Sequence, residues 1–258
     1  MFRSSTIGAV AGVMATTLAA GQPPSTPNGW RGDGTGQYRD VQPPTQWAPE
    51  AGNVLWRVKV GGGYSSPVVY KDRLFITEHP SDVVCRKTAD GSELWRVRLD
   101  YTAVLGKDKA DEIAAKHAEF DAEKKTLDAE INELRKTGSN SPELEALKDK
   151  RKAVDDRRNE YEWLLPREKR GGAGNAAATP VCAGDRLFVL FSTGIAAALS
   201  TADGKVLWSR HLEAPRDGFG HSASPLLAGG HLFIHIRQLL ALNPATGETV
   251  WRANVPAK

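Results

Sequence analysis

Short apolar runs separated by turn-forming residues recur in two parts of the chain. Between residues 66 and 99, runs rich in Val, Leu, Ile and Phe alternate with turns such as Lys71-Asp72 and Ala89-Asp90-Gly91. Short runs bounded in this way favour strands over helices. The pattern predicts four strands here, at about Ser66–Tyr70, Leu74–Glu78, Val83–Arg86 and Glu93–Leu99.

The same block occurs three times. Each copy has a small residue before a proline, a leucine seven residues after that proline, and a closing Gly-x-x-x-Trp segment. The prolines are Pro67, Pro180 and Pro225, and the closing segments are Gly91–Trp95, Gly204–Trp208 and Gly247–Trp251. Radial stacking of four-stranded units of about 40 residues gives a β-propeller. The predicted fold class is therefore mainly β: a partial β-propeller of about three four-stranded blades.

Tryptophan and glycine have separate roles in this prediction. We expect each tryptophan to pack between neighbouring blades, and each closing glycine to adopt positive φ in its turn. A fourth partial copy, from Gly52 to Trp56, precedes the first, so residues 53–60 are predicted to form an outer strand without its three inner strands. Three blades and one strand do not close a ring. We expect further blades of a longer propeller, or association, to complete it.

A stretch of different composition, at residues 105–170, separates the first copy from the second. It is rich in Ala, Glu, Lys and Leu, with apolar residues at helical spacing on both sides of Thr137–Pro142. It predicts an antiparallel coiled-coil hairpin, with Ser141 as N-cap and Pro142 at the first helical position. Two interpretations stay open: a solvated protrusion, in which the stems of Arg151 and Arg158 cover the seam, and a partner-binding or self-association arm. The apolar positions are Ile113, Phe120, Leu127, Ile131, Leu134, Leu144, Leu147, Val154, Tyr161 and Leu165.

The first residues are typical of a signal peptide. Met1-Phe2-Arg3 is a short positive region, Ile7–Ala20 is uncharged and apolar or small, and Ala19-Ala20-Gly21 suits cleavage. The apolar stretch is short for a bilayer span, and no later segment is apolar enough to cross a membrane. We therefore expect a mature chain without a transmembrane segment, located in the periplasm or secreted.

Composition narrows the class of protein but does not indicate a specific function. The chain of 258 residues is 40% hydrophobic and 25% charged, as in soluble globular proteins. A net charge of +3, without a basic run in the β part, gives no case for a nucleic-acid partner. Cys85 and Cys182 lie at non-equivalent places in two repeats, which favours two buried thiols over a disulfide.

The closing segments resemble the tryptophan-docking motif of pyrroloquinoline quinone (PQQ)-type propellers, A-x-[DN]-x-x-[TD]-G-x-x-x-W. Ala241–Trp251 matches it fully, whereas Ala198–Trp208 and Cys85–Trp95 match in part. The opening, from Trp30-Arg31-Gly32-Asp33 onward, is similar to PQQ-like repeat proteins of planctomycete-type bacteria. The resemblance covers about residues 30–100 and 174–256. It implies a blade shape shared by quinoprotein dehydrogenases and by propellers without a cofactor.

The resemblance supplies no catalytic residue here. In the dehydrogenases it would imply a carboxylate base, a calcium site and often adjacent cysteines, and the sequence has no Cys-Cys pair and no evident calcium-ligand cluster. We therefore assign no catalytic or metal-binding residue and leave cofactor-binding residues open. The predicted function is an exported, non-catalytic protein-binding or scaffold module without cofactor. Its expected partners are another envelope protein or the remaining propeller blades. The alternative is a fragment of a PQQ-dependent quinoprotein dehydrogenase, with PQQ and calcium.

Several single residues are weaker candidates for a functional role. His221, before an inner strand, is a candidate ligand contact, although hydrogen bonding within the loop is the simpler role. Arg31-Gly32-Asp33 spells an adhesion tripeptide in a glycine-rich loop. His211 is assigned to the connection between the second and third copies, and His231 and His235 are too far apart on a strand for one metal. Ser192 and Ser200 lack a nucleophile context.

These features divide the chain into five parts. Residues 1–21 are the signal peptide and 22–52 an N-terminal loop segment. Residues 53–104 hold the lone outer strand and blade 1, 105–170 the hairpin, and 171–258 blades 2 and 3.

Overall fold

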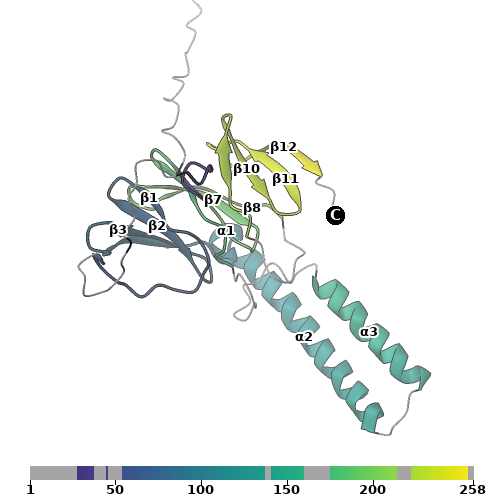
Figure 1. Cartoon of the computed structure of the whole chain (residues 1–258). Helices are drawn as coiled ribbons and strands as arrows, with labels where there is room; N and C mark the ends of the chain where they lie inside the picture. Colours follow the sequence, from purple (N-terminus) through teal and green to yellow (C-terminus); the bar gives the residue numbers. More distant parts are fainter. Residues whose placement is uncertain are drawn as a thin grey trace, which may run out of the picture.

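The computed structural model describes residues 28–37, 45, 54–136, 141–159, 175–213 and 222–254. Three four-stranded antiparallel sheets lie side by side, and a pair of helices projects from them (Figure 1). Each sheet follows chain order from its inner to its outer strand, as in propeller blades. The predicted fold class, a partial β-propeller with an inserted helical hairpin, is confirmed.

The strands fall close to their predicted positions. Blade 1 contains β1 (Val68–Tyr70), β2 (Arg73–Glu78), β3 (Asp82–Lys87) and β4 (Glu93–Arg98). Blade 2 contains β5 (Val181–Ala183), β6 (Arg186–Leu190), β7 (Ile195–Ser200) and β8 (Val206–His211). Blade 3 contains β9 (Leu226–Ala228), β10 (His231–His235), β11 (Gln238–Leu242) and β12 (Thr249–Asn254).

Two apolar clusters lie between the blades. One joins blade 1 to blade 2 and includes Phe75, Cys85, Leu187 and Ile195. The other joins blade 2 to blade 3. Because successive residues of a strand point to opposite faces, blade 2 contributes alternate residues of the same strands to both clusters. Blade 2 is therefore buried on both faces, and it fixes the positions of its neighbours.

A repeated joint connects each blade to the next. The indole of Trp95 in blade 1 lies over Gly204 in blade 2, and the indole of Trp208 in blade 2 lies over Gly247 in blade 3. Trp208 Nε1 donates to the Pro244 carbonyl at 2.9 Å. In every joint the acceptor is the main-chain carbonyl three residues before the glycine, as with Trp95 Nε1 and the Thr201 carbonyl at 3.4 Å.

Glycine is required at the three closing positions for two separate reasons. Their φ angles are 73° at Gly91, 76° at Gly204 and 71° at Gly247, which confirms the predicted positive φ. A Cβ atom at Gly247 would also lie 2.5 Å from the ring of Trp208. The turn and the tryptophan contact therefore exclude a larger side chain independently, and only the first reason was evident from the sequence.

Residues 54–60 differ from the prediction. They form no strand in the structure, because no described strand lies beside them to supply hydrogen bonds. Trp56 nevertheless occupies the joint on blade 1: it lies over Gly91, and its Nε1 donates to the Thr88 carbonyl at 2.7 Å. The segment thus makes the tryptophan contact of an outer strand without the hydrogen bonds that would pair it to a neighbouring strand.

The insertion begins with a short helix that the sequence pattern did not indicate. Helix α1 (Tyr101–Leu105) is capped by Asp100, whose carboxylate accepts from the Ala103 amide. Helix α2 (Lys107–Lys136) follows, with 30 residues, and α3 (Pro142–Asn159) returns beside it. At 1.5 Å per residue α2 is about 45 Å long, so the arm extends well beyond the blades (Figure 1).

Apolar and ionic contacts join the two helices. Ile131, Leu144 and Val154 are buried in the seam, and the Leu144 amide donates to Ser141 Oγ, which confirms the N-cap. The two arginines whose stems were expected to cover the seam reach across it: Arg151 pairs with Asp128 on α2, and Arg158 pairs with Asp121. Tyr161 and Leu165 lie outside the described residues. None of the described helices is both long and apolar enough to cross a membrane.

Candidate functional site

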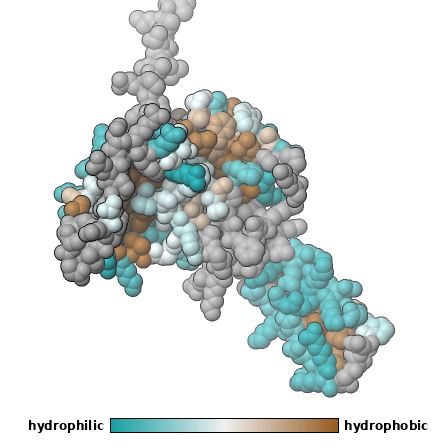
Figure 2. All heavy atoms as spheres, in the orientation of Figure 1, coloured by the Kyte–Doolittle hydropathy of each residue, from teal (hydrophilic) through white to brown (hydrophobic). Residues whose placement is uncertain are grey.

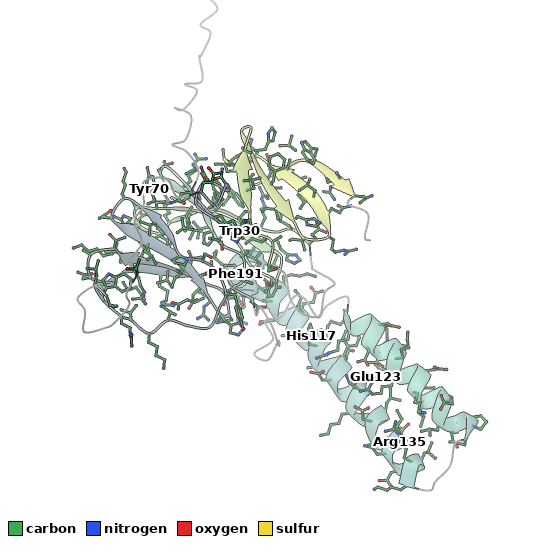
Figure 3. The ribbon with its side chains drawn as sticks, viewed as in Figure 1. Trp30, Tyr70, His117, Glu123, Arg135 and Phe191 are labelled. Atoms are coloured by element: carbon green, nitrogen blue, oxygen red, sulfur yellow. The ribbon has the colours of Figure 1, made fainter. Side chains whose placement is uncertain are left out.

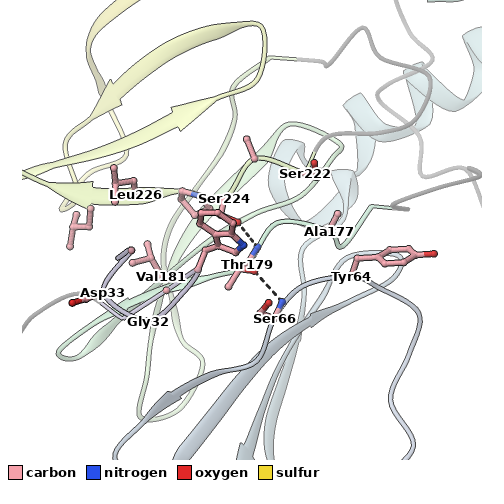
Figure 4. A pocket seen from close by; sticks show the side chains of 16 residues that line it. Gly32, Asp33, Tyr64, Ser66, Ala177, Thr179, Val181, Ser222, Ser224 and Leu226 are labelled. Carbon is pink, nitrogen blue, oxygen red and sulfur yellow. Dashed lines mark hydrogen bonds between the residues drawn. The ribbon is translucent and has the colours of Figure 1, made fainter. Parts of the chain in front are cut away.

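A hollow lies along the inner edges of the blades (Figure 4). It has a volume of about 980 Å³. One wall consists of the residues that precede the repeated prolines: Ser66, Thr179 and Ser224. The Ser66 amide donates to Thr179 Oγ1 at 3.0 Å, and the Thr179 amide donates to Ser224 Oγ at 3.0 Å. A ladder of hydroxyl contacts therefore connects the three blades beside the hollow.

An N-terminal segment also lines the hollow. The main chain of Asn28 pairs with that of Cys182 on β5, at 2.8 and 2.7 Å, and the Asn28 side chain donates to the Val69 carbonyl. The chain then turns, since the amides and carbonyls of Gly29 and Gly32 bond to each other. The segment thus adds to the inner edge of blade 2 and holds Trp30 at the hollow.

Two aromatic side chains at this site are well exposed. Trp30 is 51% exposed and Tyr64 71% exposed, and the guanidinium of Arg31 lies 4.4 Å from the Trp30 ring centroid. The Tyr64 ring points away from the hydroxyl ladder (Figure 4). Exposed aromatic rings beside hydroxyl and main-chain groups suit binding, because they offer apolar area and hydrogen bonds together.

The donor set does not fit a calcium–quinone pair. Calcium takes six to eight oxygen ligands, usually with several carboxylates. Asp33 is the only carboxylate among the described lining residues, and its Oδ1 accepts from the Thr35 amide at 2.9 Å and from Thr35 Oγ1 at 2.6 Å. Across the described residues there is no group of three or more His, Cys, Asp or Glu side chains placed to hold a metal ion.

A cluster of acids and arginines on blade 1 was missed by sequence reasoning. Arg96 NH1 donates to Glu78 at 2.8 Å and to Asp82 at 3.1 Å, and both carboxylates are buried. Glu93 also pairs with Arg96, which raises the pKa of the guanidinium above its usual range. Arg98 binds the same Asp82. This side of β4 thus pairs with carboxylates from β2 and β3.

The residues singled out from the sequence are scattered. Cys85 and Cys182 are free thiols in the same core cluster, and burial raises the pKa of both, that of Cys182 to about 12. His211 is the last residue of β8 rather than part of a connection. It packs edge-on against Tyr101, and burial lowers its pKa. His221 lies outside the described residues.

Others have structural partners. Both charged side chains of Arg31-Gly32-Asp33 have partners within the N-terminal segment, in Trp30 and Thr35. His231 and His235 stand at the two ends of β10. Ser192 is buried, and Ser200 Oγ accepts from the Ala202 amide. Of the described residues among these, Gly32 and Asp33 line the hollow.

A second, smaller hollow lies between the helices toward the tip of the arm. It measures about 590 Å³, and Figure 2 shows a hydrophobic patch in this region of an otherwise hydrophilic arm. Figure 3 shows the charged side chains that flank the helices, among them Glu123 and Arg135. The apolar lining consists of Ala129, Leu134, Ala146 and Leu147.

Comparison with solved structures finds BamB and quinohemoprotein alcohol dehydrogenases. BamB from Moraxella catarrhalis is 11% identical with a TM-score of 0.45, and the match covers 79% of this chain and 44% of that one. A quinohemoprotein alcohol dehydrogenase from Pseudomonas putida HK5 is 14% identical with a TM-score of 0.45, over 79% and 23%. That from Comamonas testosteroni is 16% identical with a TM-score of 0.38, over 76% and 21%. The chain thus spans less than half of each of these proteins.

Comparison at the level of sequence families gives a direct assignment. No curated protein sequence matches the chain. The family model described as outer membrane protein assembly factor BamB matches residues 45–115 and 153–258, which is well over half of the chain. The match omits residues 116–152, the outer part of the helical arm, so the arm is an insertion relative to the family pattern. The chain belongs to this family of PQQ-like, BamB-type β-propeller repeat proteins.

Proposed function

We propose that the chain is an exported, non-catalytic protein-binding module that acts as a scaffold in the periplasm or outside the cell. The observation that carries this proposal is the inner-edge hollow. It combines the exposed rings of Trp30 and Tyr64 with hydroxyl groups and a single, already engaged carboxylate, Asp33. Such a surface can hold a ligand, but its described residues offer no acid–base pair to transform one.

The family supports envelope protein partners. Its description names an outer membrane protein assembly factor. The helical arm adds a second surface with an apolar hollow near its tip. We accordingly propose that the partner is another envelope protein or a set of further blades, and that the inner-edge hollow is the primary contact.

The binding proposal is tested with the full chain immobilised and incubated with a solubilised envelope fraction from the cells that produce it. Proteins recovered by the wild type should be lost with Trp30→Ala. They should be retained with Leu207→Ala, a control that removes a half-exposed apolar side chain from β8. If Trp30→Ala recovers the same proteins in the same amounts, the hollow is not the binding element.

Deletion of the helical arm distinguishes a solvated protrusion from a partner-binding arm. Removing residues 107–165 and joining the ends with a short linker should leave the blades folded, because every described inter-blade joint lies outside this range. Recovery of the same partners by the deletion variant would show that the arm does not bind them. A loss confined to this variant would assign the binding to the arm instead of the hollow.

A quinoprotein dehydrogenase would give a different result. Purified chain incubated with PQQ and calcium should show no stoichiometric quinone absorbance and no dye reduction with alcohols or sugars. Stoichiometric uptake would refute the non-catalytic proposal and favour the dehydrogenase fragment.

Export is tested separately. We propose that residues 1–21 are a cleaved signal peptide and that 22–52, 53–104, 105–170 and 171–258 are the successive parts of the mature chain. Fusion of residues 1–30 to a reporter enzyme that is active only after export should give activity and a new N-terminus near Gly21. An inactive, unprocessed fusion would refute export.

A further inference from the structure

The hollow near the tip of the arm is a groove along one face of the helix pair. Its wall on α3 is formed by residues at i, i+3, i+4 and i+7 spacing, which places them on one side of that helix. This side is separate from the seam, where Ile131, Leu144 and Val154 are buried. The residues that line this tip groove are Ala129, Glu130, Glu133 and Leu134 on α2 and Glu143, Ala146, Leu147 and Lys150 on α3.

The floor of the tip groove is apolar and open to solvent. Leu134 and Leu147 are half-buried, whereas Ala129 and Ala146 are exposed. The two alanines leave room for another chain, because their side chains end at Cβ. The groove of about 590 Å³ can therefore take the apolar side chains of one further helix, in the way that an amphipathic helix lies in a hydrophobic groove.

Carboxylates without an ion pair border this floor. Most acidic side chains of the arm pair with a basic one, on the same helix or across the seam. In the described parts of α2 and α3, four form no ion pair: Asp108, Glu130, Glu143 and Asp149. Two of these, Glu130 and Glu143, line the tip groove, one on each helix.

The rim of the groove therefore keeps a net negative charge. Its third acid, Glu133, pairs with Lys136 on the same helix, and Lys150 is the single basic side chain among the described lining residues. An apolar floor with carboxylates on both sides complements a helix that carries an apolar stripe flanked by basic residues. The same face of a second copy would instead bring like charges together, which disfavours self-association at this groove.

The arm alone forms the tip groove. All its described lining residues belong to α2 and α3, and all fall within residues 116–152, which the family match omits. The blades are joined to the arm at its base, where the Tyr101 hydroxyl donates to the Thr193 carbonyl. The groove is therefore a feature that this chain adds to the propeller pattern, and its exposure does not depend on how many blades accompany it.

We propose that the tip groove binds a basic amphipathic helix of a partner protein. Apolar side chains on one face of that helix pack against Leu134 and Leu147, and the lysines or arginines beside them pair with Glu130 and Glu143. The bound helix and the two helices of the arm together form a three-helix bundle. This inference rests on the protein-binding role proposed above and adds to it a second contact of defined chemistry.

Fluorescence anisotropy with the full chain and a labelled peptide tests the charge of the bound helix. The peptide has about 18 residues, or about five helical turns, with leucines on one face and lysines elsewhere. It should bind at least about tenfold more tightly than the same peptide with glutamate in place of lysine.

Two double variants test which carboxylates receive the lysines. Glu130→Gln with Glu143→Gln should weaken binding about fivefold, because each exposed ion pair contributes modestly. Asp108→Asn with Asp149→Asn is the matched control. It removes the same charge from exposed carboxylates of the same helices outside the groove, and it should change binding by less than about twofold at physiological salt. Equal losses for the two double variants would overturn the inference, since they would reduce the effect to net charge.

Ala146→Gln tests the groove itself. Glutamine fills the floor without a change of charge and suits a helix, so binding should weaken about tenfold or more while far-UV circular dichroism stays unchanged. Ala153→Gln, at an exposed position one heptad later on α3, should bind the peptide as the wild type does. Binding that survives Ala146→Gln would overturn the inference. Concentration-dependent self-association that Ala146→Gln abolishes would assign the groove to a second copy and overturn it as well.

The peptide experiment also separates this inference from the proposed function. It does not involve the inner-edge hollow, so Trp30→Ala should bind the lysine peptide as tightly as the wild type. If the lysine peptide does not bind while envelope proteins are still recovered through Trp30, the tip groove is refuted and the proposed function stands. If the peptide binds through the tip groove while no envelope protein depends on Trp30, the inference stands and the inner-edge contact is refuted.

Discussion

Replacement of Trp208 by alanine tests the inter-blade joint directly. The indole is 8% exposed, lies over Gly247 in blade 3 and donates to the Pro244 carbonyl at 2.9 Å. Its ring also packs against Phe188 with centroids 6.3 Å apart. Truncation therefore removes the main contact between the outer parts of blades 2 and 3, and it leaves a main-chain acceptor without its donor.

The magnitude follows from burial. A buried tryptophan removes about 150–250 Å² from water, and Trp→Ala changes in protein cores cost about 3–5 kcal/mol. The lost hydrogen bond contributes about 1 kcal/mol of this total. We expect Trp208→Ala to lower the free energy of unfolding by about 4 kcal/mol. Trp251→Ala removes the equivalent but undocked residue and should cost about 1 kcal/mol or less.

Urea unfolding followed by far-UV circular dichroism measures both values. Gly247→Ala probes the other side of the joint. Alone it combines positive-φ strain with a Cβ atom 2.5 Å from the Trp208 ring, whereas in the Trp208→Ala background only the strain remains. The double variant should therefore be clearly less unstable than the sum of the single variants.

Two results would refute the claim that the tryptophan–glycine contact between blades stabilises the fold. Equal losses for Trp208→Ala and Trp251→Ala would show that docking on the next blade adds nothing to the stability of a tryptophan. Additive losses for Trp208→Ala and Gly247→Ala would show that the indole and the glycine do not interact.

Three further predictions concern ionisable groups. Burial lowers the pKa of His211, so the unfolded chain binds that proton more readily, and stability should fall as the pH drops below about 6.5. His211→Phe should flatten this slope in urea titrations between pH 7.5 and 5.0, and an unchanged slope would contradict the assignment. Burial raises the pKa of Cys182 to about 12, so the thiol should resist maleimide at pH 8 in the native chain and react in urea. Native labelling at the rate of a free thiol would contradict this burial. Arg96→Ala leaves the buried carboxylates of Glu78 and Asp82 without a shared partner and should cost about 2 kcal/mol, since the guanidinium is partly screened by solvent. Recovery of part of this loss in Arg96→Lys would support a charge effect, and equal losses would point to packing alone.

The spacing of tryptophan and glycine predicted more of the fold than composition did. A residue that recurs 26 or 28 positions after a proline must occupy an equivalent place in each blade, and the glycine four residues earlier marks the turn. The hydrogen-bond acceptor was not predictable. It is a main-chain carbonyl, and it is supplied by two threonines and a proline, Thr88, Thr201 and Pro244, whose side chains take no part in the bond.

The candidate site was harder to predict because its parts come from distant places in the sequence. The segment around Trp30 reaches the hollow through main-chain pairing between Asn28 and Cys182, and such pairing has no side-chain signature. The clustering of Glu78 and Asp82 around Arg96 likewise depends on how three strands align. No pattern in the sequence indicates which carboxylates Arg96 meets.

The arm shows how an insertion can leave a propeller joint intact. Trp95 and Gly204 lie on opposite sides of the insertion in sequence, yet they form the same contact as Trp208 and Gly247. At the base of the arm, Tyr101 is buried and its hydroxyl donates to the Thr193 carbonyl of blade 2 at 3.0 Å. The insertion therefore leaves blade 1 and is fixed at once to blade 2. Because its base is tied to the two blades that the joint connects, the arm has a set direction, and a partner bound along it would be held at a fixed position relative to the inner-edge hollow.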